Sequence, residues 1–418
     1  MQIPAIKSPE IFPLPDIQNF ILDNGLQVYY IEDKKVNGIK IEMNFAAGRI
    51  AEARHSVSEL CCELFKESAA GQSGYDNSLY FESRGSSLYT YNGMDYCGIG
   101  FFALSGFATE LFNRFIEIVT KPAFRVDELE KVQKRKLEKL NEVLAENDSL
   151  SYRSLTARVF GRNHPYGYNS TVHSIQDVRI SHVMEHFTQN YFTTDSFVIL
   201  AGNFDSQSMQ SILNALGNLK IKPKLSFNLT KKIIRQGYER KINGVHKQQS
   251  SVKMGLQVPT RNHPDFPSIY FMHILCGGYF HSRLNKNIRE RQGLTYYIAT
   301  ALETSAQAGI FYITAETASK QVPKLLTQVS KELTRMIGQP LRGAEMTMIR
   351  NYIIGNMIQF YDETFAKAET LRQQLIEGAQ WSSGYTLMKQ ISQMKAGDLN
   401  DKIKEYLLVE KMITIIAE

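Results

Sequence analysis

The string His182-Val183-Met184-Glu185-His186 follows the pattern H-x-x-E-H, whose residue types can hold and use a zinc ion. On a helix the two imidazoles lie one turn apart, and the carboxylate beside them can act as general base for a zinc-bound water. One interpretation is therefore a self-sufficient metallopeptidase that uses His182, Glu185 and His186.

The residues around this string favour another interpretation. Apolar residues recur at helical spacing and predict a buried stripe, formed by Ile180, Val183, Met184, Phe187 and Tyr191. His182, Glu185 and His186 then fall on the opposite face, which we expect to be solvated. A catalytic zinc also needs a third protein ligand in an enclosed site, and the sequence names none.

A second segment of interest is a helix expected at about residues 56–68. Its core-facing stripe consists of Val57, Leu60, Cys61, Leu64 and Phe65. Adjacent Cys61 and Cys62 point about 100° apart on a helix, so they chelate one ion poorly. Taken alone, the segment predicts a buried helix with two free thiols.

A third segment, residues 276–297, combines a glycine pair, a short basic helix, a glycine stop and an aromatic strand. Gly293 suits the C-terminal cap of the helix. The strand after it could present Tyr296 beside the helical turn of Arg289. Taken without context, Arg289 is expected to form a surface salt bridge.

The elements that position these residues repeat along the chain. Strands are expected at 17–31, 39–45, 86–103 and 196–201, and helices at 106–119, 127–146 and 181–191. A similar order returns after residue 230, with strands at 251–258, 296–316 and 411–416 and helices at 265–276, 320–337, 342–363, 365–377 and 396–406. A spacing near 210 residues favours a duplicated domain over a solenoid. We expect an α+β fold with an N-terminal domain at 1–220, a linker at 221–230 and a C-terminal domain at 231–418.

Composition excludes several classes of protein. The 418 residues carry a net charge of +6 and no long block of like charges, so nothing requires nucleic-acid binding. Four cysteines are too few for a disulfide scaffold. No apolar run is long enough to span a membrane. The N-terminus lacks the pattern of a secretory signal, so we expect a cytoplasmic protein, or a periplasmic one if a signal has been removed.

Taken in order, short landmarks along nearly the whole chain resemble the insulinase/pitrilysin superfamily of zinc peptidases, in particular the two-domain type that includes mitochondrial processing peptidase. The landmarks are Leu22–Leu26, Ala47-Gly48 with Glu52, Leu64–Lys66, Gly85 with Leu88–Thr90, Asn163–Gly167, Asn190–Phe192, Ala201–Phe204, Leu275–Gly278, Ser282–Leu284, Arg289-Glu290 and Gly293–Tyr296. The resemblance implies two homologous domains, each a mainly antiparallel sheet packed against helices, as in the LuxS/processing-peptidase-like metallohydrolase fold.

The chain departs from this family where the metal would bind. The family's H-x-x-E-H motif falls on Ser58, Cys61 and Cys62, so both imidazoles and the general base are missing. The downstream glutamate ligand of the family is best matched by Glu142, with Asp148 six residues on, and Glu138 is the less favoured register. One carboxylate cannot hold a catalytic zinc, so we expect no cofactor on this chain. The resemblance also places His182 and His186 outside the family's metal site.

The resemblance preserves one functional pair. Family members contribute an arginine and a tyrosine, seven residues apart, to the substrate side of the zinc centre, and Arg289 and Tyr296 match them. A guanidinium can clamp a peptide carbonyl, and a phenol can donate to an oxyanion. The resemblance therefore implies the zinc-free subunit of a heterodimeric metallopeptidase, which acts on peptides or unfolded polypeptides while a homologous partner supplies zinc. A purely structural pseudo-peptidase is the alternative.

Overall fold

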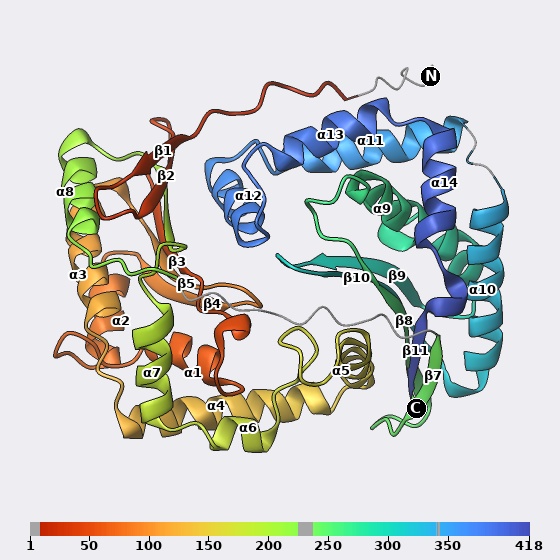
Figure 1. Cartoon of the computed structure of the whole chain (residues 1–418), viewed down its shortest axis with the longest axis horizontal. Helices are drawn as coiled ribbons and strands as arrows, with labels where there is room; N and C mark the ends of the chain where they lie inside the picture. Colours follow the sequence, from red (N-terminus) through yellow and green to blue (C-terminus); the bar gives the residue numbers. More distant parts are fainter. Residues whose placement is uncertain (1–8, 225–236, 340, 342) are drawn as a thin grey trace.

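The computed structural model describes residues 9–224, 237–339, 341 and 343–418. Most of the expected linker, residues 225–230, lies outside the described residues. In the described part, the strands form two separate sheets with helices on their outer sides (Figure 1). No helix among these residues has the length and apolar character needed to cross a bilayer.

The first sheet has the strand order β1-β2-β6-β3-β5-β4, in which only β2 and β6 run parallel. Its strands are β1 (Gln18–Ile21), β2 (Gln27–Glu32), β3 (Ile39–Phe45), β4 (Ser87–Asn92), β5 (Cys97–Ala103) and β6 (Phe197–Gly202). A tight turn joins β1 to β2 and places Gly25 at φ 84°, a conformation that glycine adopts without strain.

The second sheet has the order β7-β11-β8-β10-β9, with β7 and β11 parallel. Its strands are β7 (Tyr238–Ile242), β8 (Gln249–Val258), β9 (Tyr297–Thr304), β10 (Gly309–Ala318) and β11 (Ile413–Ala417). From the parallel pair onward, the second sheet repeats the plan of the first. The predicted α+β fold with two similar sheets is therefore confirmed, and strand β9 lies at a sheet edge.

The helices of the first half are α1 (Val57–Leu64), α2 (Gly74–Glu82), α3 (Ala108–Thr120), α4 (Val126–Leu144), α5 (Asn147–Val159), α6 (Val172–Gln176), α7 (Ile180–Asn190) and α8 (Ser206–Gly217). Those of the second half are α9 (Phe266–His273), α10 (Val322–Gly338), α11 (Gly343–Gln359), α12 (Thr364–Ile376), α13 (Ser383–Gln393) and α14 (Ala396–Tyr406). Two π-helical turns, η3 (Ile274–Gly278) and η4 (Asn285–Glu290), connect α9 to β9. The sequence patterns did not predict α2, α5, α6, α8 and α13.

The two halves exchange a helix. Helix α5 packs on β8 and β11 of the second sheet, whereas α12 packs on β6 and β2 of the first sheet (Figure 1). Each exchanged helix follows a long helix, α4 or α11, that extends away from its own sheet. The exchange ties the halves together, because each helix buries side chains against the other half.

The sheet face that contacts α12 is apolar on β2 and β6, where Ile31, Ile199 and Ala201 pack with Ala368 and Leu371, but it is polar and buried on β3. On β3, which confirms the strand expected at 39–45, the odd positions from Ile39 to Phe45 are apolar, and the even positions Lys40, Glu42 and Asn44 are fully buried as well. Tyr89 and Tyr91 of β4 reach across β5 to this row, with Tyr89 donating a 2.7 Å hydrogen bond to Glu42.

Two glycines of β5 make this crossing possible. Gly98 and Gly100 pair with Tyr91 and Tyr89, and a Cβ on either glycine would collide with the ring of its tyrosine. Gly98 and Gly100 are therefore the places where two aromatic rings cross the sheet.

Candidate functional site

Helix α1 carries the residues that match the missing zinc motif. Ser58, Cys61 and Cys62 are all buried, with exposed fractions of 2% or less. The Ser58 hydroxyl donates a 2.5 Å hydrogen bond to Asn92 at the end of β4. The apolar stripe predicted for this helix is confirmed as part of the core of the first half. The positions that correspond to the metal motif are therefore occupied by core side chains.

The thiols of α1 are bonded to backbone carbonyls. Cys62 donates to the Tyr91 carbonyl at 3.2 Å, and Cys61 lies 4.0 Å from the Val183 carbonyl. Burial raises the pKa of the Cys61 thiol, and a hydrogen bond with Cys97 together with burial raises the pKa of Cys62. Metal binding requires thiolates, so this environment opposes it.

The N-terminal end of α1 is held by Glu52. The Glu52 carboxylate accepts a 3.0 Å hydrogen bond from the backbone N–H of Ser58 and another from the Tyr168 hydroxyl. Burial raises the pKa of Glu52 to about 7, against the opposing effects of Tyr168 and Arg49. Since its oxygens serve the helix end, Glu52 acts as a positioning group for α1.

Glu142, the predicted match for the downstream ligand, is exposed near the C-terminal end of α4. Six residues earlier on α4, Lys136 lies 2.8 Å from Glu59 and 3.5 Å from Glu63 of α1. A lysine thus occupies the space between these two carboxylates. In the described ranges, no group of three or more His, Cys, Asp or Glu side chains is arranged to hold a metal ion.

Helix α7 carries the H-x-x-E-H string, and its prediction needs a correction. His186 was expected on a solvated face but is only 3% exposed, whereas Met184 was expected in the core and is 54% exposed. The helix is rotated because it packs against α1. His186 Nε2 lies 3.0 Å from the Ala47 carbonyl and Nδ1 lies 3.1 Å from the Asn190 amide.

These contacts occupy both ring nitrogens of His186. Burial lowers its pKa to about 4, so the imidazole is neutral near pH 7. His182 accepts a 3.0 Å hydrogen bond from the Arg179 N–H and thereby caps the start of α7. The small cavity beside the helix, about 120 Å³, is lined by both histidines and by Glu185. In this arrangement one imidazole stabilises the core and the other caps a helix.

Arg289 and Tyr296 flank the turn between η4 and β9. The helical turn that contains Arg289 ends at Gly293, as predicted. Gly293 has φ 60°, and its N–H donates a 3.1 Å hydrogen bond to the Arg289 carbonyl. The guanidinium lies 5.0 Å from the centre of the Phe280 ring. The expected salt bridge of Arg289 is absent among the residues that the structure describes. Tyr296 is 97% exposed.

Sequence reasoning missed a buried charge network between the halves. Lys40 and Glu42 of β3 lie 3.1 Å apart and meet Glu369 and Arg372 of α12. The Arg372 guanidinium also lies 4.4 Å from the centre of the Tyr91 ring. The polar residues of β3 were a visible signal, but their partners lie more than 300 positions away in the chain.

Comparison with known proteins gives similarities that agree with the resemblance seen in the sequence. A family model described as "Peptidase M16 inactive domain" matches residues 178–353. An uncharacterized zinc protease of Rickettsia bellii is 23% identical over 391 residues, which cover 90% of this chain and 92% of the relative. A protein of Helicobacter pylori described as "Non-peptidase homolog YmxG" is 23% identical over 323 residues, 75% of this chain and 73% of the relative.

Solved structures agree on the fold. A structure described as a peptidase M16 inactive domain from Pseudomonas fluorescens superimposes with a TM-score of 0.87 at 19% identity, covering 96% of this chain and 98% of that one. A protease from Helicobacter pylori gives 0.88 at 16% identity, covering 97% and 100%. The chain is therefore similar to M16 peptidase-family proteins in sequence along most of its length and in fold, which confirms the resemblance noted in the sequence.

Proposed function

We propose that the chain is the metal-free subunit of an M16 metallopeptidase, in which a homologous partner binds zinc and carries the general base. The chain would present Arg289 and Tyr296 to the substrate side of that zinc centre. The observation that carries the proposal is the contrast between these two residues and α1. Tyr296 is 97% exposed and Arg289 contacts a half-exposed ring, whereas the motif positions of α1 are core.

The chemistry assigned to the pair follows from its groups. A guanidinium can bind a peptide carbonyl through two parallel N–H groups. A phenol can donate to the oxygen that becomes negative in the tetrahedral intermediate, and loss of one such donor typically costs about 10²- to 10³-fold in rate. Neither group has an ion-pair partner in the described ranges, so both are available to a second subunit.

The experiment mixes the chain with a homologous subunit that retains H-x-x-E-H and measures chelator-sensitive cleavage of an unstructured peptide. We expect Arg289→Ala and Tyr296→Phe each to lower kcat/KM of the mixture by about 10²-fold. Arg291→Ala and Tyr297→Phe are matched controls, because both residues are exposed neighbours of the pair. Unchanged kcat/KM in the Arg289 and Tyr296 variants would refute the proposal.

A structural subunit is the second candidate, favoured by the Helicobacter pylori relative described as a non-peptidase homolog. In that case the chain would assemble with its partner without contributing to catalysis. The two candidates separate when assembly and cleavage are measured on the same mixtures. A structural role predicts a stable complex in which neither Arg289→Ala nor Tyr296→Phe changes any activity of the partner.

A further inference from the structure

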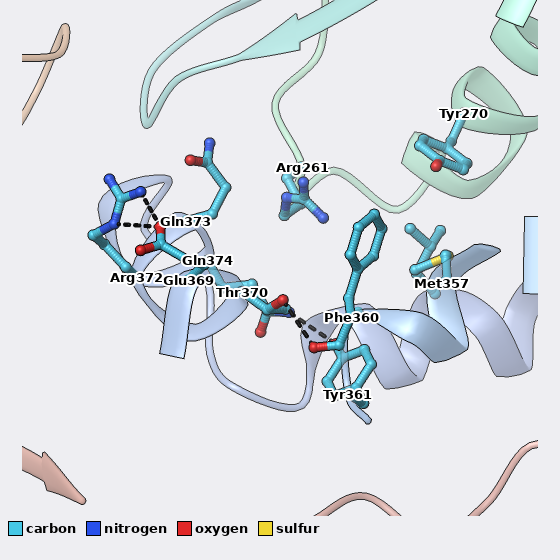
Figure 2. Close-up of a pocket in the computed structure, with 12 residues that line it drawn as sticks. Arg261, Tyr270, Met357, Phe360, Tyr361, Glu369, Thr370, Arg372, Gln373 and Gln374 are labelled. Carbon is cyan, nitrogen blue, oxygen red and sulfur yellow. Dashed lines mark hydrogen bonds and ion pairs between the residues drawn. The ribbon is translucent and has the colours of Figure 1, made fainter. Parts of the chain in front are cut away.

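Two adjoining cavities lie away from Arg289 and Tyr296, on the inner side of the second half. One, about 410 Å³, is lined by α5, the turn between β9 and β10, and the end of α12. The other, about 370 Å³, is lined by α9, α11, α12 and α13 (Figure 2). Arg261 and Gln373 line both, so the two cavities adjoin at these two side chains. Each has the size of a ligand pocket.

The first cavity contains a carboxylate held in place. Glu303 of β9 accepts hydrogen bonds from the hydroxyls of Tyr152, at 2.5 Å, and Tyr312, at 2.7 Å. A carboxylate has about four acceptor positions, and the two phenols use two of them. Phenols fix the carboxylate without neutralising it, and Glu303 itself is exposed.

The charge of this cavity is not balanced. Its charged lining residues are Arg261, Glu303 and Glu377, of which Arg261 and Glu377 form an ion pair with each other. No lysine, arginine or histidine pairs with Glu303 in the described part of the chain. One fixed negative charge therefore faces the cavity, beside the apolar side chains of Leu302 and Ile310. A lysine or arginine side chain fits such a place, since its stem packs on apolar surface while its charge meets the carboxylate.

The second cavity is mainly apolar. Met357, Tyr361 and Leu387 form buried parts of its wall, and Phe360 at its mouth is 51% exposed. Figure 2 shows the Phe360 ring extending toward Arg261, with Met357 and Tyr270 on its other side. The hydroxyl of Thr370 in α12 donates to the Phe360 carbonyl at 3.1 Å, which fixes the backbone beneath this ring. A large apolar side chain would bury its surface here.

We propose that these two adjoining cavities together bind a peptide segment in which a lysine or arginine stands close to a large apolar residue. Glu303 receives the cationic side chain, and the pocket at Phe360 receives the apolar one. The choice of a peptide as ligand rests on the proposed function. The site would let this chain select substrates although it binds no metal.

Binding is tested on the full chain without a partner. Trp381 is the single tryptophan, and its ring lies 5.1 Å from that of Tyr361 in the cavity wall, so its fluorescence reports occupancy of the apolar pocket. Four capped peptides carry one lysine and one phenylalanine separated by zero to three residues. We expect at least one to bind, with calorimetry as a second readout. The lysine-to-norleucine version of that peptide should bind about tenfold more weakly, and the difference should shrink with added salt.

Two variants locate the groups. Glu303→Gln removes the charge, keeps an oxygen that accepts from one phenol and places an amide N–H that can donate to the other, so it should weaken the lysine peptide about tenfold and leave the norleucine peptide unchanged. Phe360→Ala should weaken both peptides. Glu239→Gln, at the other edge of the sheet, and Met348→Ala, on α11 outside the cavity, are the matched controls.

The outcomes separate this proposal from the proposed function. Absence of binding by all four peptides, or equal losses for the lysine and norleucine peptides in Glu303→Gln, would overturn the peptide site. Selective binding by the isolated chain supports the site even if the mixture with a zinc-bearing subunit cleaves nothing. Conversely, normal cleavage by a mixture that contains Glu303→Gln and Phe360→Ala, with no change in peptide preference, counts against the site alone.

Discussion

Helix α1 and the segment from η4 to β9 use their polar groups in opposite ways. In α1 the serine hydroxyl and both thiols are buried and bonded within the chain. Between η4 and β9, Arg289 rests on an exposed ring and Tyr296 extends almost wholly into solvent. Groups that are already bonded inside a core cannot serve a ligand, whereas unpaired surface groups can. The comparison indicates that one region supports the fold and the other is available for a partner.

The largest expected effect comes from rebuilding the zinc motif in α1. The triple variant Ser58→His, Cys61→Glu and Cys62→His should lose roughly 4 kcal/mol or more of unfolding free energy, because two rings and a carboxylate enter fully packed positions. We expect no stoichiometric zinc. Urea unfolding and elemental analysis measure both quantities. A stable variant with one bound zinc would show that α1 is still a metal site and break the comparison.

A smaller effect is expected from removing Arg372, which links α12 to the polar residues of the first sheet. Arg372 of α12 pairs with Glu42 and covers Tyr91, whose carbonyl accepts from Cys62. Arg372→Ala leaves a buried carboxylate with one cation fewer and should cost about 3 kcal/mol. Cys62 should also react faster with thiol reagents.

The control for this experiment is Arg125→Ala. Arg125 forms a pair with Asp127 in which both side chains are more than half exposed, so its loss should cost about 0.5 kcal/mol. Equal losses for the two arginine variants would mean that the charge network between the halves contributes no more than a surface pair.

His186 gives a prediction for pH. Burial lowers its pKa to about 4, below the value near 6.5 in an unfolded chain. As pH falls, the unfolded chain takes up the proton before the folded chain does. The free energy of unfolding is therefore highest above about pH 6.5 and decreases as pH falls from about 6.5 to 4. Because of His186, the free energy of unfolding should be about 2 kcal/mol lower at pH 5 than at pH 7.

The measurement compares unfolding free energies at pH 7 and 5 for the parent chain and His186→Gln, with His182→Gln as the matched control. Glu52 has the opposite effect, because burial raises its pKa to about 7. Its contribution to the free energy of unfolding is lost as pH rises toward 7 and therefore increases as pH falls from 7 to 5. Both the parent chain and the variant contain Glu52, so its contribution cancels when their unfolding free energies are subtracted. An unchanged pH dependence in His186→Gln would mean that its imidazole is solvated, as the sequence first suggested.

Local patterns predicted much of the fold. The alternation of β3, the turn at Gly25 and the stripe of α1 were all visible in short stretches of sequence. The rotation of α7 was not, because Met184 and His186 are both compatible with either face until the helix packs on α1. A histidine that bonds through both ring nitrogens can be buried as readily as a methionine can be exposed.

Long-range polar contacts could not be predicted from a single sequence. Lys40 and Glu42 alternate with apolar residues, which is typical of a strand with one solvated face. Their burial depends on α12, which the chain brings from the other half. For Arg289 and Tyr296 the spacing was visible, but the absence of a salt bridge at Arg289 and the exposure of Tyr296 required the structure. Sequence therefore locates these side chains better than it predicts their neighbours.

The smallest expected effect is the contribution of Arg289 and Tyr296 to the unfolding free energy of the chain. Tyr296→Phe removes a hydroxyl that lies in solvent, and Arg289→Ala removes a cation–π contact with an exposed ring, so each should change the unfolding free energy by about 0.5 kcal/mol or less. The measurement is urea unfolding of the isolated chain. A loss above about 1.5 kcal/mol would mean that the pair holds η4 against β9 and is structural. Near-neutral stability, combined with a large loss of cleavage in the mixture, would instead mean that the pair acts on groups outside this chain, because nothing within the fold would depend on it.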